Sequence, residues 1–148
     1  MADIDITQAE ADALIKMEKE FLENDPLSFP EPGGRLAVPL TSRDKRENFI
    51  LDVQRYQIKL TKANYQNRAR QAIVLIRLDI DGALHRNPDG EEIPCPHLHV
   101  YKEGYGDKWA MPAPVSQYPN VQDLVSTLEA FMRHCNIVDP PEIQGRLF

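Results

Sequence analysis

The sequence predicts one α+β domain: an antiparallel sheet of about five strands, with an N-terminal and a C-terminal helix packed on one face. Two observations support this. Apolar and polar residues alternate through much of residues 35–114, and apolar residues recur at helical spacing on either side of that stretch. The 148 residues, 42% hydrophobic and 27% charged, are enough for one hydrophobic core.

The first helix is expected over residues 7–24. Thr7 is a suitable N-cap and Glu10 follows three residues later, so their side chains can satisfy two free backbone N–H groups reciprocally. Apolar residues recur at helical spacing as far as Phe21, and Pro26 lies beyond the helix.

The sheet is expected within residues 35–114. Pro39 confines the first strand to an edge or an end, because proline has no N–H to donate. The strand over 72–80 is apolar on both faces at its start, which is typical of a central strand. The predicted strands are residues 36–40, 49–58, 65–70 as the start of the next strand, 72–80, 96–102 and 108–111.

The second helix is expected over residues 120–135, with Asn120 as its N-cap and an apolar face that runs from Leu124 to Phe131. The apolar residues of the tail are expected to dock on the domain: Ile143, Leu147 and Phe148.

Strand alternation predicts a polar face on the sheet. His97, His99 and Tyr101 share one side of their strand, and Arg77 and Asp79 share one side of theirs. The opposite, apolar side of the second strand is expected to consist of Val74, Ile76, Leu78 and Ile80. If the two strands pair antiparallel with matching apolar sides, the five polar residues meet.

Such a face is suited to metal-independent acid–base chemistry on a phosphodiester. His97 and His99 would exchange protons with the substrate, and Arg77 would stabilise the developing negative charge. Tyr101 would lie in the same catalytic site, and Asp79 would orient one of the imidazole rings.

The segment 53–77 carries six cations and no acid, which is typical of an anion-binding surface. The residues expected to hold an RNA backbone and stack its bases are Lys59, Lys62, Tyr65, Arg68 and Arg70. A flap over the substrate is expected from His85, Asn87 and Asp89. Alternatively, the acidic segment 1–31 lies nearby and neutralises these cations.

A divalent metal is a further alternative, bound by His97, His99 and one of Asp79, His85 or Asp89. A single His-x-His pattern is weak support, so no metal and no cofactor are expected. The glycine-rich phosphate loops and the serine nucleophile elbow are missing from the sequence, and two cysteines outside a CxxC spacing are expected to be free thiols.

Several short motifs resemble those of a small family of bacterial and phage proteins of unknown function. They are residues 65–70, 77–79, 85–90, 97–99 and 103–109. The resemblance covers about residues 47–111 and implies a prokaryotic or phage cytosolic protein. It implies no activity, cofactor or catalytic residue.

The leading hypothesis is a small RNA-acting protein, such as a metal-independent endoribonuclease of the toxin type. The alternative is a non-catalytic acidic interaction protein, such as an immunity protein or a phage-encoded inhibitor, in which the polar face is solvated or covered by the N-terminal helix. The partner would be RNA or a protein. Without a secretory signal or a membrane-spanning stretch, a cytoplasmic location and no membrane partner are expected.

Overall fold

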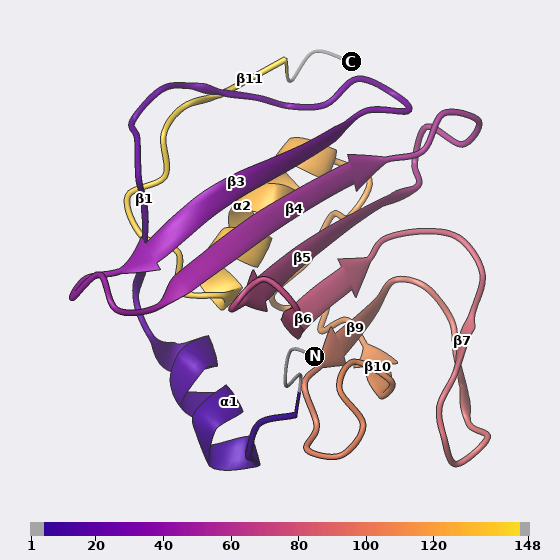
Figure 1. Cartoon of the computed structure of the whole chain (residues 1–148). Helices are drawn as coiled ribbons and strands as arrows, with labels where there is room; N and C mark the ends of the chain where they lie inside the picture. Colours follow the sequence, from indigo (N-terminus) through magenta and orange to yellow (C-terminus); the bar gives the residue numbers. More distant parts are fainter. Residues whose placement is uncertain (1–4, 146–148) are drawn as a thin grey trace.

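The computed structural model of the chain describes residues 5–145 (Figure 1). Within them lie the helices α1 (Gln8–Lys16) and α2 (Leu124–His134) and a seven-stranded main sheet. Its strands, in spatial order, are β1 (Lys19–Phe21), β3 (Arg35–Ser42), β4 (Asn48–Arg55), β5 (Ala63–Ala69), β6 (Ile73–Asp79), β9 (His97–Val100) and β10 (Ala110–Pro112). Neighbouring strands are antiparallel throughout. The α+β class is confirmed, with seven strands in place of about five.

Two small strand pairs lie outside the main sheet. β2 (Leu27–Ser28) runs parallel to β11 (Ile143–Gln144), and this pairing docks the tail through the buried Ile143. The other tail residues named above, Leu147 and Phe148, lie outside the described residues. β7 (His85–Arg86) and β8 (Glu92–Ile93) form a hairpin. Neither helix within residues 5–145 has the length and apolar run that crossing a membrane requires.

One face of the main sheet is apolar and lies under α2 (Figure 1). Val53, Tyr65, Leu78 and Leu98 are successive cross-strand neighbours on β4, β5, β6 and β9, each at most 2% exposed. The Tyr65 hydroxyl donates to the carbonyl oxygen of Leu124 at the start of α2, at 2.7 Å. Burying an apolar side chain of this size stabilises a fold by about 2 kcal/mol, so this row secures the helix to the sheet.

The helix α1 lies beside the ends of the strands, whereas α2 lies across the sheet (Figure 1). The predicted cap of α1 is confirmed, because Oγ1 of Thr7 accepts the backbone N–H of Glu10 at 3.1 Å. The helix ends well before the predicted residue 24. The chain becomes extended at Met17 because Lys19–Phe21 pair with β3, so the apolar spacing that predicted a longer helix belongs partly to a strand.

A buried lysine secures this helix-to-strand turn. Lys19 is 0% exposed, and its ammonium donates to the carbonyl oxygens of Ile15, Met17 and Cys135 at 3.0, 2.9 and 2.7 Å. Burial lowers the pKa of Lys19 to about 8, and the nearby Cys135 opposes this only in part. We call Lys19 with its three carbonyl acceptors the lysine cluster.

Two further sequence predictions concern element boundaries. α2 begins after Asp123, whose side chain accepts the N–H of Ser126 at 3.1 Å. The predicted cap, Asn120, lies one turn earlier, where its carbonyl oxygen accepts the hydroxyl of Thr127. The expectation for Pro39 is confirmed, because β1 pairs with β3 only over Leu40–Ser42 and leaves Pro39 on an open stretch of edge.

The apolar side of β6 is interrupted by a β-bulge. The register between β5 and β6 shifts so that Leu75 has no cross-strand partner on β5. Ile76 and Leu78 keep the predicted side, but Val74 moves to the opposite side of the sheet. The prediction was wrong at Val74, because alternation along a sequence assumes a regular strand.

Candidate functional site

Two rows of polar side chains cross the face of the sheet opposite α2, which we call the open face. One row consists of Gln54, Asn64, Asp79 and His97. The other consists of Asp52, Gln66, Arg77 and His99. The predicted antiparallel pairing of the two strands is confirmed, and so is the meeting of Arg77 and Asp79 with both histidines.

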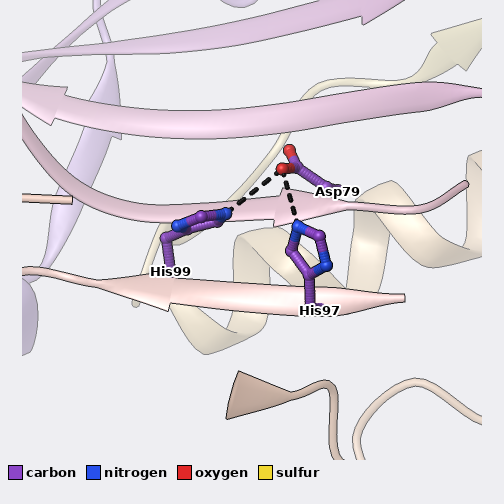
Figure 2. Close-up of side chains that lie close together, drawn as sticks. All are labelled: Asp79, His97 and His99. Atoms are coloured by element: carbon purple, nitrogen blue, oxygen red, sulfur yellow. Dashed lines mark hydrogen bonds and ion pairs between the residues drawn. The ribbon is translucent and has the colours of Figure 1, made fainter. Parts of the chain in front are cut away.

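Asp79, His97 and His99 form a compact group, the Asp–His cluster (Figure 2). Nε2 of His97 lies 3.0 Å, and Nε2 of His99 lies 3.2 Å, from Oδ2 of Asp79. Figure 2 shows both rings projecting from β9 toward the carboxylate on β6. The three metal-ligating atoms lie within 4.8 Å of one another, so this is the group within residues 5–145 that can hold a metal ion.

The remaining ring nitrogens face backbone carbonyls. Nδ1 of His97 is 3.2 Å from the carbonyl oxygen of Ile93, and Nδ1 of His99 is 2.8 Å from that of Asp107. Because a carbonyl oxygen can only accept, each Nδ1 carries a hydrogen. Nε2 of each ring faces the Asp79 carboxylate, to which it donates a hydrogen bond when it carries a proton, and it offers a lone pair when it does not.

Arg77 connects the cluster to a second carboxylate. Its guanidinium donates to both carboxylate oxygens of Asp79, at 3.1 and 3.3 Å, and to Oδ2 of Asp107 at 2.8 Å. One of its nitrogens, Nη2, also lies 3.0 Å from Nε2 of His99. Burial by itself would raise the pKa of Asp79, but hydrogen bonds from His97 and His99, with the charge and hydrogen bonds of Arg77, hold that pKa well below its usual range. Asp79 is therefore ionised.

Both histidines are shielded from solvent. His97 is 2% exposed and His99 is 0% exposed. The ring of His85, from the β7–β8 hairpin, stands edge-on to His99 with their centroids 4.6 Å apart. Neither His97 nor His99 therefore presents a ring nitrogen to a dissolved substrate.

The segment predicted as a flap is a hairpin fixed to its neighbours. The side chain of Asn87 exchanges two hydrogen bonds with the backbone of Ala110, at 2.9 and 2.8 Å. Nε2 of His85 lies 2.7 Å from the carbonyl oxygen of Lys108, and Asp89 accepts a backbone N–H at the hairpin tip. Of the three candidates for the third metal ligand, Asp79 is therefore the one whose ligating atom faces the histidine pair.

A polar groove of about 710 Å³ lies on the open face beside the cluster. Four cations line it, namely Arg35 of β3, Lys62 just before β5, Arg68 of β5 and Arg77 of β6. Asp79 also lines the groove, whereas His97 and His99 do not. The carboxylate of Asp79 is thus the point at which the cluster meets the groove.

Comparison with known proteins gives a match to one protein family. A model of a family of unknown function, DUF6978, matches residues 6–137. The chain belongs to this family. The match extends well beyond the resemblance over residues 47–111 and takes in the cluster, the groove and α2. No curated protein and no solved structure gives a significant match.

In this DUF6978 chain, two of the predicted RNA-binding cations reach the groove. Lys62 lines it with its ammonium 4.3 Å from the ring centre of Tyr56, and Arg68 lines it while paired with Asp52 at 2.8 Å. Lys59 pairs with Asp81 at 3.2 Å and is not among the groove-lining residues.

Arg70 points away from the groove. Its φ of 52° places it in the turn after β5, where alternation no longer decides direction. There it pairs with Glu47 at 2.8 Å and with Glu10 at 3.5 Å. The basic segment is therefore neutralised mainly by acids of neighbouring strands and loops, and Glu10 adds a contribution from the acidic N-terminal segment.

The two tyrosines predicted for the site lie elsewhere. Tyr65 is 0% exposed under α2, so its ring has no free face on which a base can stack. The hydroxyl of Tyr101 donates to the carbonyl oxygen of Ile6 at 2.8 Å and accepts its N–H at 2.9 Å. Tyr101 follows β9, and its hydroxyl secures the N-terminal segment instead of facing the histidines.

Sequence reasoning missed Asp107, which pairs with Arg77 and whose carbonyl oxygen faces His99. It lies in a loop between β9 and β10, where no periodic pattern predicts direction. Arg35 was also missed, although its place at the start of β3 was a usable signal. Cys95 lines the groove as a free cysteine, but burial and the charge of Asp79 raise its thiol pKa, so it does not supply a thiolate at neutral pH.

Proposed function

We propose that this protein binds RNA in the groove on the open face. The observation that carries the proposal is the placement of Arg35, Lys62, Arg68 and Arg77 around one groove on a protein whose net charge is −6. The carboxylates of Asp52, Asp79 and Asp81 also line the groove, so the four cations exceed the acids by one. Asp52 pairs with Arg68 and Asp79 pairs with Arg77, so Arg35 and Lys62 provide the main support. On an acidic protein, this local excess of positive charge supports a specific anionic ligand over general attraction to polyanions.

The spread of the cations favours a polymer over a single phosphate group. Arg35 and Arg77 stand on β3 and β6, which are three strand spacings apart, or about 14 Å. Between them the groove offers the amides Gln54, Asn64 and Gln66. Alternating positive and amide groups on an open sheet suit phosphates together with bases and 2′-hydroxyl groups.

Tyr56 supports the same ligand. It lines the groove beside Lys62, and its ring is half-buried, so one edge of the groove has an aromatic surface. Aromatic side chains in a cationic groove are the usual means of holding single-stranded RNA, because every base can stack on them.

The proposal is binding and not metal-independent cleavage. Cleavage of that kind requires His97 or His99 to exchange protons with the RNA, and both rings are buried behind Asp79. The groups that can contact a phosphate are the guanidinium of Arg77 and the other groove cations. Asp79 is a weak base, because its pKa lies far below neutral pH.

Fluorescence anisotropy with a labelled single-stranded oligoribonucleotide, in chelator and over a range of salt concentrations, tests the proposal. We expect the double variant Arg35→Ala/Lys62→Ala to bind more weakly and to reduce the slope of log affinity against log salt by about 0.7 for each phosphate that is no longer neutralised. Arg46→Ala/Arg133→Ala is the matched control, because it removes the same charge from exposed residues outside the groove.

Equal weakening in both double variants, or no binding even at low salt, would remove the RNA proposal. The non-catalytic protein-interaction hypothesis would then lead. It has less support, because the acidic N-terminal segment already uses Glu10 on Arg70 and Glu18 on Arg43. Gel analysis of the same RNA, with and without chelator, shows separately whether any bound RNA is cut.

A further inference from the structure

We propose that Asp79, His97 and His99 bind one divalent first-row transition-metal ion, with Zn²⁺ as the reference ion. The ligands would be Oδ2 of Asp79 and Nε2 of each histidine. This inference is independent of the RNA proposal, because it concerns binding of the ion alone.

Two of the three separations within the cluster are those of ligands around one ion. Two ligands about 2.0–2.1 Å from zinc at a tetrahedral angle lie about 3.3 Å apart. Nε2 of His97 and Nε2 of His99 lie 3.0 and 3.2 Å from Oδ2 of Asp79. The three ligating atoms all lie within 4.8 Å of one another, so a bound ion would draw the two imidazoles toward each other.

The ring nitrogens that face away from the cluster show the arrangement of metal-bound histidines. Each Nδ1 donates to a backbone carbonyl, from Ile93 for His97 and from Asp107 for His99. Such bonds fix the ring and the tautomer and leave Nε2 free as a ligand. One carbonyl belongs to β8 and the other to the loop between β9 and β10, so each ring has its own partner.

A cation also resolves a mismatch at His99. Nε2 of His99 lies 3.0 Å from Nη2 of Arg77, which can only donate, and 3.2 Å from Oδ2 of the ionised Asp79, which can only accept. No single protonation state of Nε2 satisfies both neighbours. With a proton, this nitrogen bonds to Asp79 but faces an N–H of Arg77, and without one it faces a carboxylate lone pair. An ion on Nε2 would displace Nη2 of Arg77, whereas Nε of Arg77 keeps its bond to Oδ1 of Asp79 and Nη1 keeps its bond to Oδ2 of Asp107.

The position of the cluster gives such an ion access to ligands. The histidines are buried, but Asp79 and Arg77 line the groove, so the coordination positions not filled by protein would face it. Three protein ligands with an open position are typical of sites at which a metal meets a substrate or water. Two imidazoles and one carboxylate suit transition metals, whereas Mg²⁺ prefers oxygen ligands.

Calorimetry on chelator-treated, full-length protein tests the site. We expect one equivalent of Zn²⁺ to bind, Co²⁺ to bind with a visible absorption spectrum free of thiolate charge-transfer bands, and Mg²⁺ not to compete. Asp79→Asn and His99→Ala should each weaken Zn²⁺ binding by at least about 100-fold, because each removes a direct ligand. His134→Gln is the matched control, since it changes a histidine on α2 that is partnered by Tyr118.

A wild-type measurement keeps the proposal testable if a variant fails to fold. Long-range nitrogen–proton correlation spectra of the histidine rings should show Zn²⁺ on Nε2 and hydrogen on Nδ1 for two rings, and no change in tautomer for the other two. Absence of stoichiometric Zn²⁺ binding would overturn the proposal. So would binding that survives Asp79→Asn and His99→Ala, a thiolate band that implicates Cys95, or ring signals that do not respond to Zn²⁺.

Discussion

The lysine cluster and the Asp–His cluster are two buried polar groups in one small fold, and they are completed differently. In the lysine cluster, three ammonium protons meet three carbonyl oxygens, so every donor has an acceptor. In the Asp–His cluster, Oδ2 of Asp79 faces Nε2 of both histidines. Each Nδ1 faces a backbone carbonyl oxygen, so a neutral ring carries its one hydrogen on Nδ1 and has none on Nε2 for Asp79. The first group is complete within the protein, and the second calls for a proton or an ion.

Their surroundings differ in the same way. The lysine cluster joins α1, β1 and the end of α2, and its one charged side chain is 0% exposed. The Asp–His cluster lies on the open face, where Asp79 borders the groove. A buried charge with all partners supplied by backbone has a structural role. A buried polar group with mismatched partners next to a groove is the place to look for function.

The largest effect is expected from removing the charge of the lysine cluster. Lys19→Met leaves three buried carbonyl oxygens without a donor, and we expect a decrease of about 3 kcal/mol in the free energy of unfolding. Urea denaturation measures it. Lys16→Met, at an exposed position one turn earlier, should change stability by less than about 0.5 kcal/mol. A decrease of similar size in both variants would contradict a structural role specific to Lys19.

A smaller effect is expected where the hairpin covers the Asp–His cluster. Asn87→Ala removes two buried hydrogen bonds to the backbone of Ala110, and we expect the free energy of unfolding to fall by about 1.5 kcal/mol. Hydrogen exchange should increase in residues 85–93 and stay unchanged around Lys19. Glu91→Ala, at an exposed position in the same hairpin, is the control. Faster exchange throughout the chain would show that the hairpin is not a local cover.

The smallest effect is expected in the pH dependence of stability, to which the lysine cluster contributes through Lys19. The pKa of Lys19 is about 8 in the folded chain against an ordinary 10.5, so the unfolded chain binds this proton more tightly between those values. Stability attributable to Lys19 therefore rises with pH. We expect the advantage of the parent over Lys19→Met to widen by about 1 kcal/mol from pH 7 to pH 9. Denaturation of both proteins at the two pH values checks this, and a constant or narrowing gap would contradict it.

The sequence predicts the open face well because strand alternation is a local property. Arg77, Asp79, His97 and His99 meet as expected, since β6 and β9 pair with their apolar sides matched. The same reasoning fails for Arg70, which turns away at a positive φ, and for Val74, which changes sides at a bulge. The pattern of apolar residues predicts neither the positive φ at Arg70 nor the bulge beside Val74.

Burial and cover are harder to predict, because they depend on contacts between distant segments. The sequence suggests a flap over 85–90, but not that His85 stands edge-on to His99 or that both cluster histidines are buried. Nor does it show that Lys19 is buried, since a lysine in an apparently amphipathic helix is expected on the solvent side. Proton exchange with a substrate requires an exposed side chain, so the sequence alone could not show whether His97 and His99 can perform it.

The short strands at both edges bear on how the protein behaves when concentrated. β1 covers only three residues of the longer β3, and Pro39 stands on the stretch that it leaves bare. At the other edge, β10 is three residues long and ends in Pro112. A proline offers no N–H to an incoming strand, so neither edge is a good template for sheet extension by a second molecule. Both edges of this broad sheet are thus protected against edge-to-edge assembly into fibres.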